Sequence, residues 1–460
     1  VGPAAVAGSP ALALISALAH AVAGDRGLAE ADLASCWAAW PATPEADLRR
    51  LRQLVVTTHA LADGTAPAAV SRDWPDVLGA YEGTDLEAWA RLGLGWTMLC
   101  AGEPARPELE AAERLARDHG FDFLRLHSLS ALAVLSARDG AFPAMESAAA
   151  AAVELAYALG WTSSPWLSTN HLMIGFARLL CLDPVAALDE ARHAEAALAA
   201  DAPSRSRYLV GVLSGAACVD EGRRREGLAL LRAARHDHGD ASVPAPLLAA
   251  GALIEHRSTV DAGQDALAQQ LAAWVRERVG NVAELGLMRA RASFAHGGLE
   301  ATEEMLAGRP ALCPTTPLEA ELLATALEIR LGRRTRARDS LYESLVRAEP
   351  VSLIRPFHDA DLSVRQLLLE QVGGFGSANG FAARVSQTVS TMDARRADVL
   401  TSREHAVLVR LSSPQSLDEL AVDLRVSVNT VKTHVRAIYA KLGVNNRRGA
   451  VVAGRQLGLA

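Results

Sequence analysis

Several classes of protein are excluded by what the sequence lacks. Its 460 residues hold five cysteines, an odd number, spread far apart and never in a C-x-x-C pair, so neither a disulfide framework nor a zinc site is expected. No apolar run reaches the roughly 20 residues that cross a bilayer, and no basic residues precede the apolar stretch at 11–19 as they would in a signal peptide. We therefore expect a cytoplasmic protein with no membrane partner.

Motifs for catalysis and cofactor binding are also missing. The sequence has no G-x-x-x-x-G-K-[ST] phosphate loop, no G-x-S-x-G nucleophile elbow and no H-E-x-x-H helix. The closest histidine pair, His236 and His238, lies beside Asp237 and Asp240 in a polar segment, and alternate residues of a flexible loop would hold a metal only weakly. We predict no enzyme activity, no cofactor and no metal site.

Charge is distributed unevenly along the chain. The formal net charge is −7, yet residues 400–460 contain nine Lys or Arg against four Asp or Glu. From Arg425 to Arg455 there are seven basic residues and no acidic one, and both lysines of the protein, Lys432 and Lys441, lie there. An acidic body with a basic end is the charge pattern of a nucleic-acid contact, although a solvated basic face would have the same composition.

Helical periodicity dominates the first 370 residues, and strand patterns are scarce. Helix-breaking positions recur about every 34 to 43 residues, the length of a helix, a turn and a second helix. These positions are Gly140, Asp183-Pro184, Gly222, Gly263, Gly297 and Gly332. We predict an all-α fold with an α-solenoid of tetratricopeptide-like helical hairpins, and a compact non-repetitive helical domain is the alternative. Trp161 and Trp166 could line a ligand groove, but packing at a hairpin is the favoured interpretation.

A glycine-rich segment follows the repeats. Gly373, Gly374, Gly376 and Gly380 could be read as a phosphate-cradling loop, but no buried strand precedes them and no Lys-Ser or Lys-Thr pair follows. We predict that residues 371–398 form a flexible linker. This linker would join a helical-repeat sensor or interaction domain at 1–370 to a second domain at 399–460.

Three capping patterns divide the last 60 residues into short helices. Thr401 with Glu404, and Ser416 with Glu419, form capping boxes, and Ser427 is placed to cap a third helix. The turn between the second and third helices is short enough to hold them at a steep angle. The pattern predicts a helix-turn-helix, whose third helix ends at Gly443 and is followed by a last helix from about residue 446 to 457.

The third helix has two unlike faces. Val431, Val435, Ile438 and Leu442 form an apolar stripe that would pack on the first two helices. The opposite face is polar and basic, and its spacing suits the major groove of DNA, where Lys and Arg pair with guanine and Asn with adenine. Hydroxyls at the helix N-terminus would contact phosphate, and arginines beyond the helix would contact the backbone beside the groove. The predicted DNA-binding residues are Ser427, Asn429, Thr430, Lys432, Thr433, Arg436, Lys441, Arg447 and Arg448.

Residues 400–450 resemble the LuxR-type helix-turn-helix domain. The resemblance rests on LTSRE at the start, ELA in the second helix, S-x-x-TVKTH, the I-Y-x-KLGV run and Arg447. It implies base contacts at Lys432, Thr433 and Arg436 and backbone contacts around Thr430 and Arg447. Two features depart from the family pattern: Pro414 replaces the usual Gly, and Leu417-Asp418 replaces the common Asn-Lys, which removes one phosphate contact.

The segment AEPVSLIRPFHDADLSVRQLL also resembles the stretch that precedes this domain in large MalT-like regulators. Such regulators join an ATPase, a helical-repeat sensor and a LuxR-type tail, so the chain resembles their sensor and output half without the ATPase domain. It opens at Val1, and either a longer protein or a relative without an ATPase is consistent with this.

We expect a bacterial transcription regulator that binds double-stranded DNA, as a homodimer on DNA paired through the last helix. Its repeats would take a small-molecule or protein effector, and RNA polymerase is a further expected partner. The alternative is an interaction scaffold whose DNA-binding tail is weakened.

Overall fold

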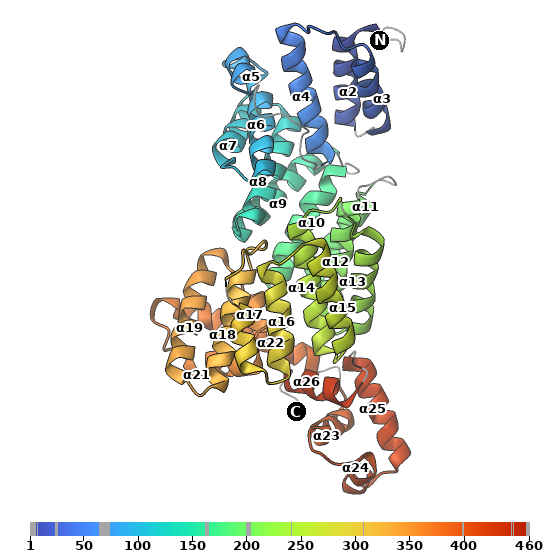
Figure 1. The fold of residues 1–460 in the computed structure, drawn as a ribbon, viewed down its shortest axis with the longest axis vertical. Coiled ribbons are helices and arrows are strands. Elements are labelled where there is room, and N and C mark those ends of the chain that lie inside the picture. Colours follow the sequence, from blue (N-terminus) through green and yellow to red (C-terminus); the bar gives the residue numbers. More distant parts are fainter. Residues whose placement is uncertain are drawn as a thin grey trace. The chain divides into compact units, whose positions relative to one another are not determined.

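The computed structural model describes residues 6, 8–23, 26–63, 74–161, 165–198, 204–240, 242–306, 308–397, 400–442, 444 and 446–456. These residues form helices and no strand, which confirms the predicted all-α class (Figure 1). None of the helices they form combines the length and apolar character that crossing a membrane requires. The chain divides into two compact units, Val1–Ile174 with His193–Pro203, and Gly175–Arg192 with Ser204–Ala460.

The first unit consists of antiparallel helices whose contacts are made largely by alanine and leucine. Its helices are α2 (Pro10–Ala23), α3 (Arg26–Ala38), α4 (Ala46–Asp63), α5 (Trp74–Tyr81), α6 (Glu87–Ala101), α7 (Arg106–Asp118), α8 (Asp122–Arg138) and α9 (Phe142–Ala158). Gly140 turns α8 into α9 with a φ of 72°, a left-handed value that glycine adopts readily. Trp161 and Trp166 are half-buried against the cluster around Leu126 and Val153, as the hairpin-packing interpretation predicted.

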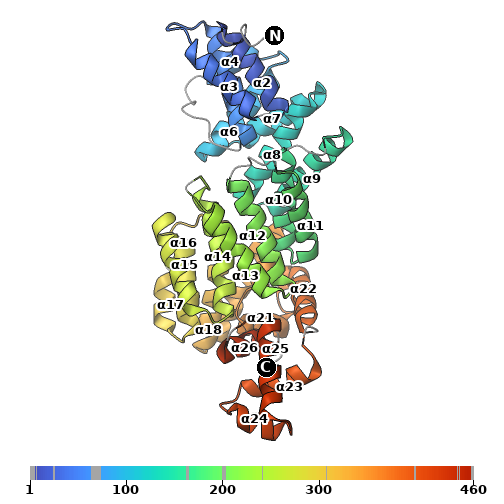
Figure 2. The ribbon, with the colours of Figure 1, turned by 90° about the vertical axis from the view of Figure 1, so that its right-hand side faces the viewer.

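Helices α10 (Pro165–Leu180) and α11 (Pro184–Ala196) are divided between the two units. The second unit then continues as helical hairpins that stand side by side in Figure 2. They are α12 (Ser204–Asp220), α13 (Arg224–His238), α14 (Ala245–Asp261), α15 (Asp265–Arg278), α16 (Ala283–Ala295), α17 (Leu299–Leu306), α18 (Thr316–Arg330) and α19 (Arg334–Ala348). Gly222, Gly263, Gly297 and Gly332 make the hairpin turns with positive φ, which confirms the repeat positions predicted from the sequence.

The α12–α13 hairpin shows why small residues are needed between the helices. A Cβ on Gly227 would lie 2.5 Å from the carbonyl oxygen of Gly215, and a Cβ on Gly215 would lie 2.9 Å from that of Gly227. Neither position has space for a side chain, so the two backbones touch directly. The high alanine and glycine content therefore sets the separation of the paired helices.

Buried charges tie the end of the repeats to the hairpins of the second unit. After the short helix η1 (Glu349–Val351) comes α20 (Arg355–His358), in which Arg355 donates from Nη1 and Nη2 to the carboxylate of Asp220 at 2.5 and 3.2 Å. Both side chains are almost wholly buried, at 6% and 1% exposed. Arg257 of α14 forms an ion pair with Asp359, directly after α20. These pairs hold α20 against α12 and α14.

Residues 371–397 are not part of the flexible linker that the glycines predicted for 371–398, and residue 398 is outside the described residues. This segment follows α21 (Leu362–Gln371) and contains η2 (Gly376–Ala378) and the 19-residue helix α22 (Asn379–Ala397). The buried side chains of this segment are Phe375, Ala378, Phe381, Ala382, Val385, Val389 and Met392. Since these residues pack into the second unit, the segment is structured, and the predicted domain limits stay predictions. His236 and His238 likewise lie in the last turn of α13 and not in a loop.

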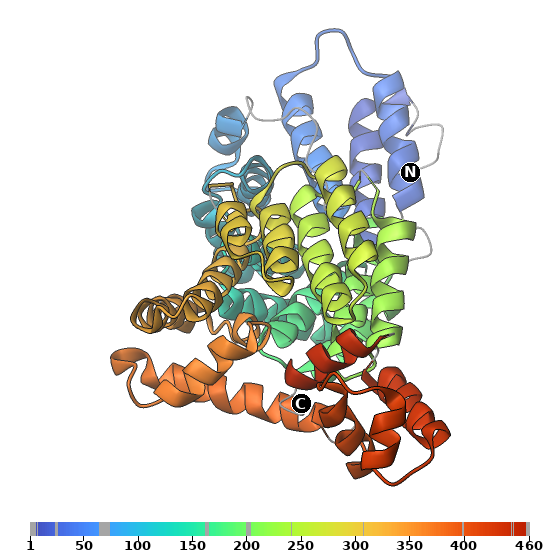
Figure 3. The same cartoon turned by 60° about the horizontal axis from the view of Figure 1, so that its bottom comes forward.

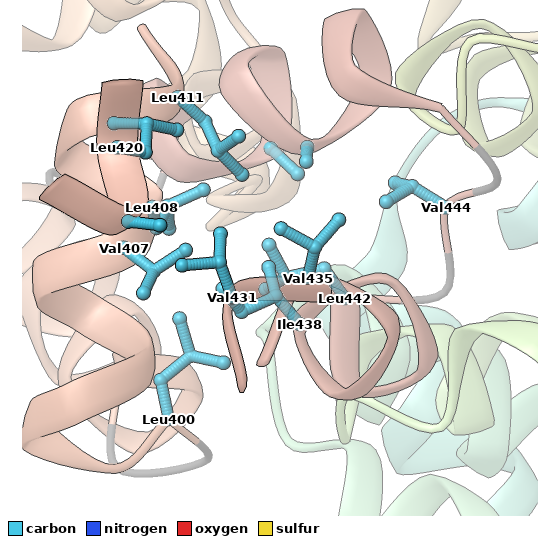
Figure 4. Close-up of a cluster of buried hydrophobic side chains, with 13 residues drawn as sticks. Leu400, Val407, Leu408, Leu411, Leu420, Val431, Val435, Ile438, Leu442 and Val444 are labelled. Atoms are coloured by element: carbon cyan, nitrogen blue, oxygen red, sulfur yellow. The ribbon is translucent and has the colours of Figure 1, made fainter. Parts of the chain in front are cut away.

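The chain ends in four short helices around a core of their own. They are α23 (Ser402–Leu411), α24 (Leu417–Asp423), α25 (Val428–Leu442) and α26 (Arg447–Gln456). Figure 4 shows side chains of α23, α24 and α25 meeting in this core, with Leu408, Leu420, Val431 and Ile438 at 0% exposure. Ala450 and Ala453 of α26 complete it. The four helices therefore share one core, which sets how they pack on one another.

Candidate nucleic-acid interface

Both capping boxes that the sequence predicts are present. The backbone N–H of Thr401 donates to Glu404 Oε2 at 2.7 Å, and the N–H of Glu404 donates to Thr401 Oγ1 at 3.3 Å. Ser416 and Glu419 make the same pair of bonds, also at 2.7 and 3.3 Å. These contacts satisfy otherwise unpaired N–H groups and fix where α23 and α24 begin.

The turn between α24 and α25 is built on a left-handed residue. Arg425 has a φ of 54°, its N–H donates to the carbonyl of Val422, and the N–H of Val426 donates to that of Ala421. This pair of bonds is a Schellman motif, which closes a helix and reverses the chain within a few residues. Ser427 then caps α25, as predicted, by accepting the N–H of Thr430 at 3.1 Å.

The predicted apolar stripe of α25 faces inward. Val431 and Ile438 are 0% exposed, and Val435 and Leu442 are each 6% exposed. They contact residues of α23, α24 and α26, as Figure 4 shows. Burial of this stripe fixes the rotation of α25 about its axis, and therefore which side chains point outward.

The opposite face of α25 is open to solvent. Asn429, Lys432, Thr433 and Arg436 are all exposed, and their spacing of three and four residues places them on one side of the helix. Thr433 Oγ1 donates to the carbonyl of Asn429 at 2.9 Å, which leaves its methyl group turned away from that bond. The structure thus brings together four of the predicted base-contacting side chains. Ser427 is exposed and Thr430 half-buried at the N-terminal end of the same helix.

Lys441 has a partner within the domain. Its Nζ donates to Glu404 Oε2 at 2.6 Å, which links the end of α25 to the start of α23. Burial disfavours ionisation of Glu404, but the hydrogen bonds from Lys441 and from Thr401 outweigh it and hold the pKa of Glu404 below its usual value. The sequence predicts Glu404 only as a capping residue, because no local pattern connects it to a lysine 37 positions later.

Arg447 is directed into the domain. Its Nε donates to the carbonyl of Leu411 at 2.9 Å, Nη1 to that of Gln415 at 2.6 Å and Nη2 to that of Ser413 at 2.5 Å. The three carbonyls belong to the end of α23 and the turn before α24. The guanidinium therefore spans this turn from the first residue of α26.

Arg448 contacts the helical body of the same unit. Nη1 lies 3.1 Å from His296 Nε2 and 3.7 Å from Asp265 Oδ2, and Nη2 donates to the carbonyl of Ala295 at 3.3 Å. Next to it, Asn446 Nδ2 donates to the carbonyl of Gly263 at 3.2 Å. Figure 3 shows the red C-terminal helices beside the green hairpins. Asn446 was not among the predicted functional residues, because its partner is a backbone group far away in sequence.

Gly449 follows in the same contact. A Cβ at this position would lie 2.9 Å from the carbonyl oxygen of Ala262, in the turn between α14 and α15. The start of α26 therefore touches two consecutive hairpin turns of the body, at Ala262–Gly263 and at Ala295–His296. Gly443 and Leu457, expected to end α25 and to lie on α26, are outside the described residues.

The known proteins to which this chain is similar include transcriptional regulators. The family described as "Bacterial regulatory proteins, luxR family" matches residues 398–453. The chain is 42% identical over 72 residues to the probable transcriptional regulatory protein NarL of Mycobacterium tuberculosis (strain ATCC 25618 / H37Rv), an overlap of 16% of this chain and 32% of NarL. It is 28% identical over 162 residues to the HTH-type transcriptional regulator MalT of Klebsiella pneumoniae (strain 342), covering 30% of this chain and 18% of MalT.

The chain thus spans about a third of NarL and less than a fifth of MalT. The overlap with MalT, 162 residues, is longer than the segment matched by the family, so similarity to MalT reaches beyond the terminal helices. The family match, the two capping boxes, the left-handed turn and the polar face of α25 all concern the same residues. The C-terminal helices α23–α26 are a LuxR-type helix-turn-helix domain, and the chain resembles the MalT-like regulators of that family.

Proposed function

We propose that this chain is a transcription regulator that binds double-stranded DNA by placing α25 in the major groove. One observation carries the proposal: α25 buries its apolar stripe in the core and leaves Asn429, Lys432, Thr433 and Arg436 exposed on one face. Lys and Arg donate to guanine O6 and N7, Asn pairs with adenine, and each good contact discriminates against a wrong base by about 1–3 kcal/mol.

The N-terminal end of α25 supplies the first phosphate contacts. Ser427 and Thr430 bring hydroxyls to the end of the helix where backbone N–H groups and the helix dipole favour an anion. Two copies of the domain would occupy paired half-sites of an operator, with α26 as the pairing helix. The protein would act in the cytoplasm and carry no enzyme activity of its own.

The helical body is the sensor in this proposal. It would bind a small molecule or a protein, and RNA polymerase would be a further partner at the promoter. Contact between the body and the start of α26, through Arg448 and Asn446, supports this coupling because it is a direct route from the hairpin turns to the DNA-binding domain. An effector that moved these turns would change how α26 is held.

Selection of bound duplexes from a random pool with the intact chain tests DNA binding. Enrichment of an inverted repeat is the expected result. Binding of the enriched duplex should weaken steeply with salt, with a log–log slope of about 0.9 for each phosphate contact. Arg436→Ala should lower affinity and relax the preference at one base pair by about 1–3 kcal/mol.

Arg276→Ala is the matched control, because Arg276 is an exposed arginine on α15 of the body. It should leave affinity and base preference unchanged. A pool without enrichment, or an equal loss of operator affinity in Arg436→Ala and Arg276→Ala, would contradict base recognition by α25. The first outcome would favour the alternative of an interaction scaffold with a weakened tail.

A further inference from the structure

The assignment of Arg447 to the DNA backbone does not agree with where its side chain lies. We infer that Arg447 is a positioning residue, which fixes the recognition helix by holding the turn between α23 and α24, and that it makes no phosphate contact. This inference rests on the proposed function, because it explains how α25 is held in the orientation that DNA contact requires.

All three guanidinium nitrogens of Arg447 donate to backbone carbonyls, those of Leu411, Ser413 and Gln415, at 2.5–2.9 Å. The planar guanidinium presents its N–H groups in a fixed fork, so three acceptors arranged around it define one orientation of the group. Swinging the side chain out to a phosphate would break all three bonds at once. A hydrogen bond with a charged partner contributes more than a neutral one, and the side chain is half-buried, so this exchange is unfavourable.

The acceptors need such a donor. Leu411 is the last residue of α23, whose final carbonyls have no partner within the helix and carry the negative end of its dipole. Gln415 immediately precedes Ser416, the residue that caps α24. The guanidinium of Arg447 thus supplies hydrogen bonds to a carbonyl at the end of α23 and to a carbonyl just before the N-cap of α24.

The position of Arg447 in the chain shows that it links α26 to the turn before α24. It is the first residue of α26, which follows α25 after four residues, so its bonds connect the far end of α25 to the start of α24. Helix α24 packs on α25 through Leu420 and Ala421, which share a core with Val431. The angle between α24 and α25 is therefore fixed at both ends, by the Arg425 turn at one and by Arg447 at the other.

Lysine is the informative replacement at this position. An ammonium keeps the positive charge and reaches a phosphate as well as arginine does, but it lacks the planar fork that serves three carbonyls. We therefore compare Arg447→Lys and Arg447→Ala in the full chain, with Lys432→Ala as the reference for a side chain on the DNA-facing side of α25. Affinity for the selected operator duplex and for a scrambled duplex is measured over a range of salt concentrations.

Positioning predicts that both Arg447 variants lose about tenfold or more in operator affinity, and that the preference for operator over scrambled duplex falls. The salt slope should stay at the wild-type value, and lysine should not restore binding. A phosphate contact predicts the reverse: the slope falls by about 0.9 in Arg447→Ala, and Arg447→Lys binds like wild type. Either of these last results overturns the inference.

Hydrogen exchange of the DNA-free chain separates this inference from the proposed function. Amides of α23, α24 and their turn should exchange faster in Arg447→Lys, while circular dichroism shows an unchanged helix content. Unchanged hydrogen exchange of these amides in Arg447→Lys overturns the inference, whatever the result of the DNA-binding measurements. Faster exchange in a chain whose wild type shows no salt-dependent DNA binding contradicts the proposed function and leaves the structural role of Arg447 in place.

Discussion

At the scale of single residues, Glu404 combines three contacts in one carboxylate. It accepts hydrogen bonds from the N–H and the hydroxyl of Thr401 and from the Nζ of Lys441, and its side chain is 7% exposed. Burial disfavours its charge, but the hydrogen bonds lower the pKa of Glu404 below its ordinary value of 4.5. A carboxyl whose folded-state pKa is depressed stabilises the fold above its unfolded pKa, and this contribution is lost as the pH falls through the folded pKa.

We expect Glu404→Gln to lower the free energy of opening of α23 by about 1–3 kcal/mol at neutral pH, because a charged hydrogen-bonding partner is lost. Below pH 4.5 this free energy should fall less steeply in the variant than in the wild type. Hydrogen exchange of the α23 amides at several pH values measures both effects. Glu419→Gln is the matched control, since it removes a capping-box glutamate that has no lysine partner; equal losses at neutral pH would contradict the role of Lys441.

The same residues show what local pattern can and cannot reveal. The capping boxes and the apolar stripe of α25 were predictable, because their partners lie three or four positions apart and depend on helical geometry alone. The contacts of Arg447 were not, since its acceptors are backbone carbonyls 32 to 36 residues away, and a carbonyl is present at every position. From the sequence, the charge of Arg447 and its place in the family pattern predict a contact with the DNA backbone.

At the scale of elements, the turn between α24 and α25 contains a conformational strain that the sequence does not reveal. Arg425 occupies a left-handed conformation, at φ 54°, that glycine adopts without strain and other residues adopt at about 1–2 kcal/mol. Glycine also loses more entropy on folding, by roughly 0.5–1 kcal/mol. The two effects leave a small net gain for glycine at this position.

We expect Arg425→Gly to stabilise the C-terminal domain by up to about 1 kcal/mol, and Arg425→Ala to give no such gain, because alanine keeps the strain of a Cβ. Hydrogen exchange of the α24 and α25 amides in the full chain is the measurement. Both variants remove the same charge, so any difference between them reports on the backbone. A gain in Arg425→Ala equal to that in Arg425→Gly would show that the side chain, and not the conformation, is unfavourable.

Helix α22 lies where the sequence predicts a flexible linker. Its four nearby glycines and polar residues were interpreted as a linker, yet Phe381, Val385, Val389 and Met392 fall at helical spacing and are buried. Gly373, Gly374 and Gly376 lie in the turns before the helix, where Gly373 and Gly376 have positive φ, and Gly380 is the second residue of α22. The glycine-rich composition of residues 371–397 concealed the helical spacing of these apolar residues. In the hairpins, by contrast, each glycine lies between two segments whose apolar periodicity is clear.

At the scale of the whole molecule, the hairpins of the second unit contact the C-terminal helices at α26 and at α25, which lies against α13. The polar face of α25, with Asn429, Lys432 and Arg436, stays exposed. Arg448 and Val452 lie one helical turn apart on α26, and Val452 is 36% exposed. The pairing of two domains that we propose for α26 would use the same side of this helix as the contact of Arg448 with the body. In that case the body would limit pairing without covering the exposed side chains of α25 that we propose to contact bases.

This competition makes a prediction that uses the body alone. Replacing Asp265 by Asn together with His296 by Ala removes two partners of Arg448 and leaves every residue of the DNA-binding domain unchanged. If the contact restrains pairing, the double variant should bind an inverted-repeat operator more tightly, about tenfold for each 1.4 kcal/mol of restraint removed, with more dimer at equal protein concentration. Binding to a single half-site should not change, because α25 is exposed in either arrangement, and Glu277→Ala on the far part of α15 should behave as wild type. An operator affinity equal to or below that of wild type would mean that the docked arrangement does not restrain pairing, so that the body must act on the tail by another route.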